Sequence, residues 1–225
     1  MNIVAVTIWY DEKPSHLYRL ARSLDGLCDA LVAVDGAYSY FPGGLYGSPR
    51  EQAAALTQGT SVAGVELLLH KPSRLWEGEV EKRNSALRLA KKFSPDWVVI
   101  VDGDTEISEH AGAREALAAT KFDVAVTRMI DDESIEDRQW CDIRNVFRYS
   151  DDLCWWRTHY TVRNDEKLLW CALPPHERAA LGYPPVASAL SLRNLTMTHH
   201  PKLSSRRAQA TQSYERRDDL GIEAP

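Results

Sequence analysis

The chain of 225 residues is 44% hydrophobic and 26% charged, which is the composition of an ordinary folded protein with room for one sizeable domain. Its formal net charge of −5 gives no general attraction to nucleic acid or to an acidic membrane, because proteins that bind these carry basic patches. The N-terminal residues lack the basic and apolar regions of a signal peptide, and no apolar run approaches the length of a membrane span. We therefore expect a cytoplasmic protein without a transmembrane segment.

Strands and helices are predicted to alternate through the first 130 residues. Short apolar runs rich in β-branched residues predict buried strands at 3–8, 31–35, 65–69, 97–101 and 124–129. Apolar side chains at helical spacing predict helices at 16–24, 50–58, 79–93 and 109–119, the first of them capped by Ser15. This alternation is typical of a mostly parallel central sheet with helices on both faces.

The sequence after residue 130 is less regular and richer in Trp, Arg and Asp. It predicts short strands at 145–149, 160–163 and 193–198, and a polar helix at 204–220. No Gly/Ser-rich linker divides the chain, so we expect a single domain over 1–225 in which this smaller region folds onto the first half.

Acidic residues follow three of the predicted strands. Asp11 and Glu12 follow the first, Asp35 ends the second, and Asp102 and Asp104 flank a glycine after the fourth. In parallel α/β sheets, ligands bind outside the carboxyl ends of the strands. Two carboxylates beside a buried strand call for a cation, and Mg²⁺ or Mn²⁺ prefers oxygen ligands that it often shares with substrate phosphates. The pair suggests a metal-bound diphosphate, although a solvated acidic turn would have the same sequence.

Four segments, in this order and spacing, resemble the nucleotide-sugar half of the GT-A glycosyltransferases, near glycosyltransferase family 2: VTIWYDEKPSHLYRLARSL, VAVDG, EVEKRNSALRLA and WVVIVDGDTEI. The resemblance implies a Rossmann-like GT-A fold with a nucleotide-sugar-binding half over 1–130 and an acceptor-binding half over 131–225. It implies a metal-dependent glycosyltransferase that moves a sugar from a nucleoside-diphosphate sugar to an acceptor hydroxyl. Asp11 stands where that family usually has Asn, and a longer loop than usual follows Asp35.

The same resemblance assigns roles to individual residues. It implies that the nucleotide-sugar is bound by Thr7, Trp9, Tyr10, Glu12, Asp35, Lys82, Arg83, Asn84, Asp102 and Gly103. It implies that Mn²⁺ or Mg²⁺ is held by Asp102, Asp104 and a late histidine, for which we slightly favour His199 over His200. Side chains alternate along a strand, so at most one of these two histidines should reach the metal.

Residues beyond 130 supply candidates for the remaining chemistry. Lys202 and Arg207 follow the two histidines and would neutralise the departing nucleoside diphosphate. An inverting transfer needs a general base, and Asp132, just beyond the fifth predicted strand, is our first candidate. Other candidates are His159, Asp165 and Glu177. A retaining transfer would need no such base. The acceptor is open: a glycan, a protein, a small molecule or a modified nucleic acid.

Other functions remain open at this point. A sugar-nucleotide nucleotidyltransferase shares the sheet and uses Mg²⁺, but such enzymes usually carry a glycine-rich loop after the first strand, where this chain has WYDEKP. A non-catalytic nucleotide-sugar binding module would bind its ligand and leave it unchanged. Transfer to a modified nucleic acid gains no support from the acidic net charge, although the basic residues near the C-terminus keep it open.

Overall fold

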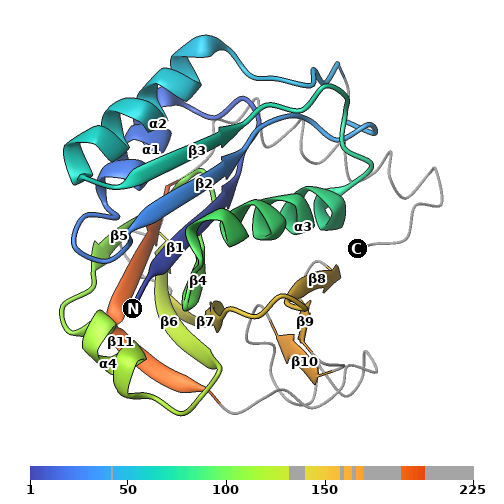
Figure 1. Ribbon diagram of the computed structural model, residues 1–225. Helices are drawn as coiled ribbons and strands as arrows, with labels where there is room; N and C mark the ends of the chain where they lie inside the picture. The colour runs from blue at the N-terminus through green and yellow to red at the C-terminus, as the bar shows by residue number, and fades with distance from the viewer. Residues whose placement is uncertain (42, 132–139, 158–159, 164–165, 170–188, 201–225) are drawn as a thin grey trace.

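The computed structural model describes residues 1–41, 43–131, 140–157, 160–163, 166–169 and 189–200 (Figure 1). Seven of the sequence-based predictions fall outside these residues: the helix at 204–220, Asp132, Lys202, Arg207 and the other general-base candidates His159, Asp165 and Glu177. Within the described part of the chain, no helix has both the length and the apolar character needed to cross a bilayer.

A large twisted sheet forms the centre of the described structure (Figure 1). Its strands are β1 (Ile3–Ile8), β2 (Ala30–Val34), β3 (Glu66–His70), β4 (Trp97–Ile100), β5 (Thr105–Glu109), β6 (Val124–Asp131), β7 (Trp140–Arg148) and β11 (Leu190–His199). Their order across the sheet is β3-β2-β1-β4-β7-β6-β11-β5. The pairings β1–β2, β2–β3, β1–β4 and β6–β11 are parallel, and the other three are antiparallel. The predicted α/β fold with a mostly parallel sheet is therefore confirmed.

The structure also contains a second, smaller sheet, which is antiparallel. It consists of β8 (Cys154–Arg157), β9 (Tyr160–Arg163) and β10 (Glu166–Leu169), in the order β10-β9-β8. Only β9 was expected from the sequence. All three strands have four residues, but β9 (YTVR) contains β-branched Thr and Val, whereas β8 (CWWR) and β10 (EKLL) contain no β-branched residue.

Four α-helices occur in the described residues: α1 (Pro14–Arg22), α2 (Arg50–Ala63), α3 (Glu79–Ala90) and α4 (Ala113–Ala119). The predicted cap of α1 is wrong. The helix begins at Pro14, after Lys13, and no side chain caps it. Proline at the first helical position needs no partner for its missing N–H and already has a helical φ, so Ser15 lies within the first turn.

The predicted helix at 109–119 is wrong in its first part. Residues 105–109 form β5, in which Thr105 and Ile107 are buried while Glu106 is half-buried and Ser108 is exposed. That alternation has the period of a strand. Gly112 then adopts the left-handed conformation (φ 72°) immediately before α4 begins. The glycine separates the strand from the helix, which is why only the second part of the prediction is helical.

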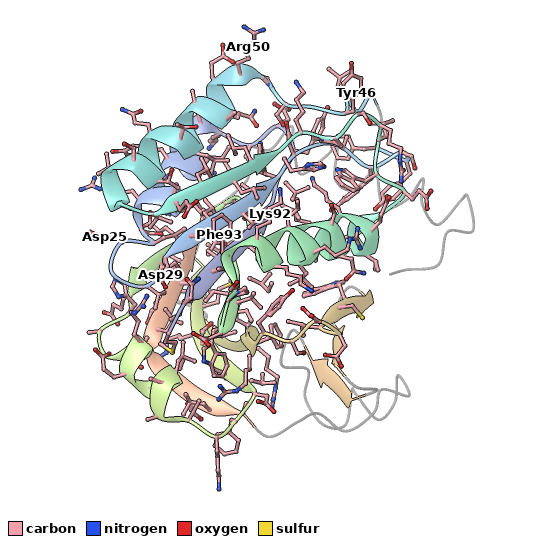
Figure 2. The ribbon with its side chains drawn as sticks, viewed as in Figure 1. Asp25, Asp29, Tyr46, Arg50, Lys92 and Phe93 are labelled. Atoms are coloured by element: carbon pink, nitrogen blue, oxygen red, sulfur yellow. The ribbon has the colours of Figure 1, made fainter. Side chains whose placement is uncertain are left out.

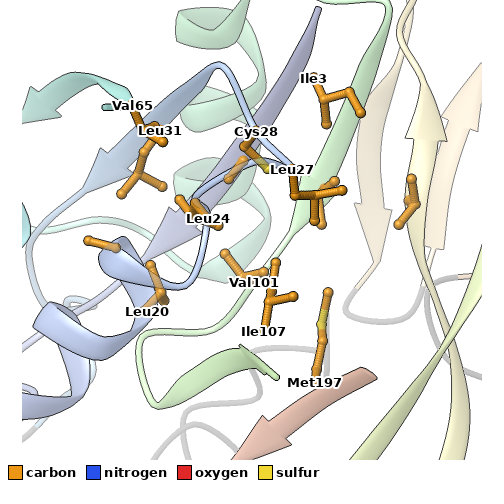
Figure 3. Packing of buried hydrophobic residues seen from close by; sticks show 14 of the residues in the cluster. Ile3, Leu20, Leu24, Leu27, Cys28, Leu31, Val65, Val101, Ile107 and Met197 are labelled. Atoms are coloured by element: carbon orange, nitrogen blue, oxygen red, sulfur yellow. The ribbon is translucent and has the colours of Figure 1, made fainter. Parts of the chain in front are cut away.

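The helices cover both faces of the large sheet, as predicted. Ile3 and Ala5 of β1 join a core with α1, α2 and α4, whereas Val4 and Val6 join a second core with α3 and β8. Figure 3 shows part of the first core, where Leu20 and Leu24 lie near Val101, Ile107 and Met197. Burying each large aliphatic side chain contributes about 1.5–3 kcal/mol. These two layers hold the strand ends, and therefore the site, in place.

Candidate functional site

The strand order places a topological switch point beside β1. The chain runs from β1 outward to β2 and β3 and then returns to β4 on the other side of β1. The carboxyl ends of all four strands lie at one edge of the sheet, because every pairing among them is parallel. Ligands of open α/β sheets bind outside this edge, where the strand order reverses. The segments that leave β1 and β4 there are 9–12 and 101–104.

The last strand brings the late histidines to the same edge. β6 runs parallel to β4, because both pair antiparallel with β7, and β11 runs parallel to β6. The register pairs His199 with Asp131 on one side and with Thr105 on the other. The acidic turn after β4 and the end of β11, which are nearly a hundred residues apart in sequence, are therefore neighbours.

A tight turn follows β4, closed by the Thr105 N–H, which donates to the Asp102 carbonyl at 3.0 Å. A Cβ atom added to Gly103 would lie 3.1 Å from Glu12 Cγ and 3.2 Å from Trp9 Cβ. Both distances are tighter than ordinary packing contacts. The glycine thus allows the turn to lie directly against the residues that leave β1.

Replacing Gly103 by alanine is expected to push the turn away from the end of β1. We expect a loss of about 1–3 kcal/mol in the free energy of unfolding, as for other overpacking substitutions. Gly78→Ala is the matched control, because a Cβ there meets no atom within 4 Å. Thermal unfolding of the two variants checks this, and equal stability would contradict the close approach.

Asp104 and His199, two of the predicted metal ligands, are in contact. Asp104 is 3% exposed, and its Oδ2 lies 3.3 Å from His199 Nε2. The next residue, His200, donates its backbone N–H to the Asp104 carbonyl at 2.8 Å. Its ring instead stacks on His16, with centroids 5.6 Å apart, and its Nε2 lies 3.3 Å from Glu106 Oε2. The two histidines contact different groups, as strand alternation predicts.

Asp102, the third predicted ligand, pairs with Arg83. The guanidinium donates from Nη2 to Asp102 Oδ1 at 3.1 Å and from Nε to Glu79 Oε1 at 2.6 Å, and it lies over the ring of Trp155. Burial lowers the pKa of Arg83, but the neighbouring carboxylates of Glu79 and Asp102 outweigh it and raise that pKa above its usual value. A permanent positive charge therefore lies beside the acidic turn.

Lys82 links the ends of β1 and β2. It is 2% exposed, and its Nζ donates to the carbonyls of Trp9 and Gly36, both at 2.6 Å. Burial lowers the pKa of Lys82 to about 7, against the opposing effect of the Asp35 carboxylate. The amine holds the two strand ends together.

Asp35 and Asn84 also make contacts within the protein. Asp35 accepts hydrogen bonds from the Ser48 N–H, the Ser48 hydroxyl and the Gly36 N–H at 2.7, 2.5 and 2.6 Å, and so fixes the loop after β2. Asn84 exchanges two hydrogen bonds with the backbone of Trp155, which joins α3 to β8. For both residues, a role toward a nucleotide stays a prediction.

The remaining predicted residues line the exit of β1. Thr7 and Trp9 are buried, and Thr7 Oγ1 and Trp9 Nε1 have no hydrogen-bond partner among the described residues. The Tyr10 hydroxyl accepts a hydrogen bond from the Leu45 N–H at 2.9 Å, and Glu12 is 9% exposed. These side chains surround the switch point, at which two polar atoms lack a partner in the part of the chain that the structure describes.

Three residues in the site were not anticipated from the sequence: His16, Ser48 and Gln52. Burial, followed by the nearby Lys13 and Arg19, lowers the pKa of His16 to about 4. A lone histidine or glutamine on a predicted helix carries no signal of such a role. Only the placement of Gln52 on the same helical face as Leu56 could have marked it as buried.

The donor chemistry at the turn fits a hard divalent cation in part. The Asp104 carboxylate and the His199 imidazole meet there, and Mg²⁺ commonly takes its other ligands from water and substrate phosphates. Among the described residues, however, no group of three or more His, Cys, Asp or Glu side chains is arranged to hold a metal, and Asp102 is paired with Arg83. The metal therefore stays a prediction.

A cavity of about 460 Å³ lies at the opposite end of the sheet. It is lined by Asn2, Glu66, Leu67, Leu68, Lys92 and Phe93, at the amino ends of β1 and β3. Figure 2 shows Lys92 and Phe93, which belong to the short 3-10 helix η1 (Lys91–Phe93) after α3, far along the sheet from Tyr46 in the loop that follows β2. None of the predicted site residues lines this cavity.

Comparisons with known proteins gave matches among solved structures alone. No protein-family model and no curated protein matches the chain. The structure of S. aureus TarS 1–349 matches with a TM-score of 0.46 at 18% identity, over 62% of this chain and 38% of that one. The same protein in complex with UDP-GlcNAc gives 0.47, at 18% identity over 62% and 37%. Its complex with UDP gives 0.48, at 18% identity over 62% and 38%.

The chain spans less than two fifths of the length of these matched structures. At this identity and TM-score, the matches carry no argument about function. The fold is established by the strand order and the two helical layers described above. It is a Rossmann-like α/β fold, as the resemblance to the GT-A glycosyltransferases implied.

Proposed function

We propose that the protein is a metal-dependent glycosyltransferase that uses a nucleoside-diphosphate sugar as donor. The observation that carries this proposal is the meeting of Asp104 and His199 beside the switch point between β1 and β4. A buried carboxylate is costly unless it is paired, and an arrangement of carboxylate, imidazole and acidic turn at the ligand edge of the sheet suits a metal-bound diphosphate.

Each residue has a defined part in this proposal. Asp104 and His199, with Asp102 beside them, would hold Mn²⁺ or Mg²⁺, which would neutralise the charge that develops on the departing diphosphate. Arg83 adds a permanent positive charge beside the turn, and its hydrogen bond orients the Asp102 carboxylate. Lys82 and Gly103 keep the end of β1 close to both neighbouring strands. The nucleotide would bind along the residues that leave β1.

The general base is proposed to be Asp132. β6 ends at Asp131, which the strand register pairs with His199. Asp132 is the next residue in the sequence, and it lies outside the described residues. A carboxylate there would accept the proton of an acceptor hydroxyl in an inverting transfer.

A thermal-shift screen tests the proposed donor site. UDP, GDP and their sugars are added with and without Mn²⁺. Ligand at about a hundred times its dissociation constant stabilises a protein by about 2.7 kcal/mol, which for a chain of this size raises the midpoint by roughly 5–10 °C. We expect such a shift with at least one nucleotide, and only when Mn²⁺ is present.

The same screen separates the alternatives. No response to any nucleotide would contradict the proposal. A binding module would instead be favoured by two results together. The nucleotide would cause a metal-dependent shift, and no nucleoside diphosphate would be released from the donor when sugars and peptides are offered as acceptors. Release of pyrophosphate from a nucleoside triphosphate and a sugar phosphate would favour the nucleotidyltransferase.

A further inference from the structure

Two polar side chains hold the residues that leave β1. Ser48 lies just before α2 and Gln52 lies in its first turn, and they are 9% and 3% exposed. The buried face of α2 consists of Gln52, Ala55, Leu56, Gly59 and Thr60, at helical spacing. An uncharged amide at the start of this face costs free energy unless its hydrogen bonds are made. Its two partners therefore explain why a glutamine is placed there.

Those partners belong to consecutive residues at the end of β1. Gln52 Oε1 accepts the Glu12 N–H at 3.0 Å, and Gln52 Nε2 donates to Asp11 Oδ1 at 3.2 Å. The Gln52 amide has one accepting end and one donating end. Only one orientation of the amide suits these two partners, and in that orientation both ends form a hydrogen bond. A single side chain thus fixes the backbone of one residue and the side chain of the other.

The backbone at Asp11 needs such support. Its φ is +48°, a left-handed conformation that residues other than glycine rarely adopt. The Asp11 N–H donates to Ser48 Oγ at 2.9 Å, and the Ser48 hydroxyl and N–H donate in turn to Asp35. An unfavourable conformation of this kind persists where its surroundings over-determine it, which is common at functional sites.

The turn at Asp11 directs Glu12 toward the acidic turn after β4. Glu12 Cγ is the atom nearest to a Cβ built on Gly103, at 3.1 Å. Glu12, whose N–H donates to Gln52, therefore packs directly against the glycine between Asp102 and Asp104. Through Ser48 and Gln52, the start of α2 is connected to the ends of β1 and β2 and to the turn after β4.

We propose that Gln52 is a positioning residue of the candidate site. Its side-chain amide sets the backbone at Asp11 and Glu12, and thereby the packing of Glu12 against the turn at Gly103. The consequence for nucleotide binding rests on the proposed function. The effect on the turn at Gly103 does not depend on the proposed function.

The test compares two substitutions in the buried face of α2, made in the full chain. Gln52→Met keeps the length of the side chain and removes the amide. Thr60→Val is the control, because it removes a buried hydroxyl from the same face of α2, two turns along the helix. In the described residues, the only partners of this hydroxyl are carbonyls of α2 itself. Hydrogen exchange is followed by mass spectrometry in peptides spanning 9–17 and 100–108.

We expect Gln52→Met to accelerate exchange by about fivefold to tenfold in both peptides, the change expected when a buried hydrogen bond is lost. Thr60→Val should leave both peptides at the wild-type rate. In parallel, the affinity for the nucleotide that binds the wild type with Mn²⁺ should fall about tenfold in Gln52→Met and stay unchanged in Thr60→Val.

Two results would overturn the inference. One is unchanged exchange in the 100–108 peptide of Gln52→Met; the other is the same acceleration in both variants, which would mean a purely structural role. If Gln52→Met does not fold, Gln52→Glu provides the test, because it keeps an oxygen that can accept the Glu12 N–H and removes the group that donates to Asp11 Oδ1. If UDP and GDP do not bind the wild type, the proposed function fails, and the exchange rates still decide the role of Gln52.

Discussion

Asp104→Asn is expected to abolish the Mn²⁺-dependent response to nucleotide and to lower transferase activity at least about a hundredfold. Asparagine has the shape of aspartate but no negative charge, so it binds a hard cation poorly. Fold stability should be unchanged or higher, because the variant no longer buries a carboxylate that is 3% exposed. Thermal shift with Mn²⁺ and nucleotide, alongside unfolding without ligand, measures both effects.

Asp123→Asn is the matched control for this prediction. Asp123 is also a carboxylate next to a strand, but it comes directly before β6 begins, and it pairs with Arg148 near the surface, away from the acidic turn. We expect its nucleotide response to match that of the wild type. If Asp104→Asn retains the full metal-dependent response, the carboxylate does not hold the metal and the proposed mechanism is wrong.

Lys82→Met is expected to destabilise the protein in a pH-dependent way. At pH 9 we expect a loss of about 2–4 kcal/mol in the free energy of unfolding, because the carbonyls of Trp9 and Gly36 lose their donor. An uncharged amine has two N–H groups, which match these two carbonyls. The hydrophobic part of the side chain is kept, so the loss reports the hydrogen bonds.

The pH dependence follows from the pKa of Lys82, which burial lowers to about 7. Between pH 7 and about 10.5 the unfolded chain carries the extra proton, so wild-type stability rises with pH in this interval. From pH 7 to pH 9 this amounts to roughly 2 kcal/mol, which Lys82→Met should lack. Urea unfolding at the two pH values measures it, with the exposed Lys92→Met as control. A constant difference between wild type and Lys82→Met would show that the amine keeps the same charge throughout.

The sequence predicted the first half of the fold well because its signals are local. Continuous apolar runs form the strands Ile3–Ile8 and Ala30–Val34. Such runs are typical of buried parallel strands. The inward placement of Arg83, at 7% exposed, also followed from helical projection. β5 was missed because its five residues, TEISE, contain a single aliphatic side chain. Its strand conformation depends on pairing with β11, far along the chain.

The charged residues of the site could be predicted from the sequence, but the contacts between them could not. The acidic turn and the late histidine could be recognised from residue type and from their position after strands. That Asp104 meets His199 while Asp102 meets Arg83 depends on the register of β11 against β5 and on the position of α3. A hydrogen-bond network such as that of Gln52 has no sequence signal, since its partners are a backbone N–H and a side chain forty residues away.

The insertion of β11 between β6 and β5 has a consequence for the order in which the protein assembles. In the described residues, β5 pairs with β11 alone, and β11 also supplies His199. A nascent chain that has not yet reached residue 189 would leave β5 unpaired and one side of β6 open, and such strand edges promote aggregation. The parallel strands before it can pack first, but the proposed metal ligands Asp104 and His199 meet only after β11 has been synthesised. Closing so long a loop also slows folding. Activity would therefore report on chains that include β11, and fragments that end before this strand would fold in part without acquiring it.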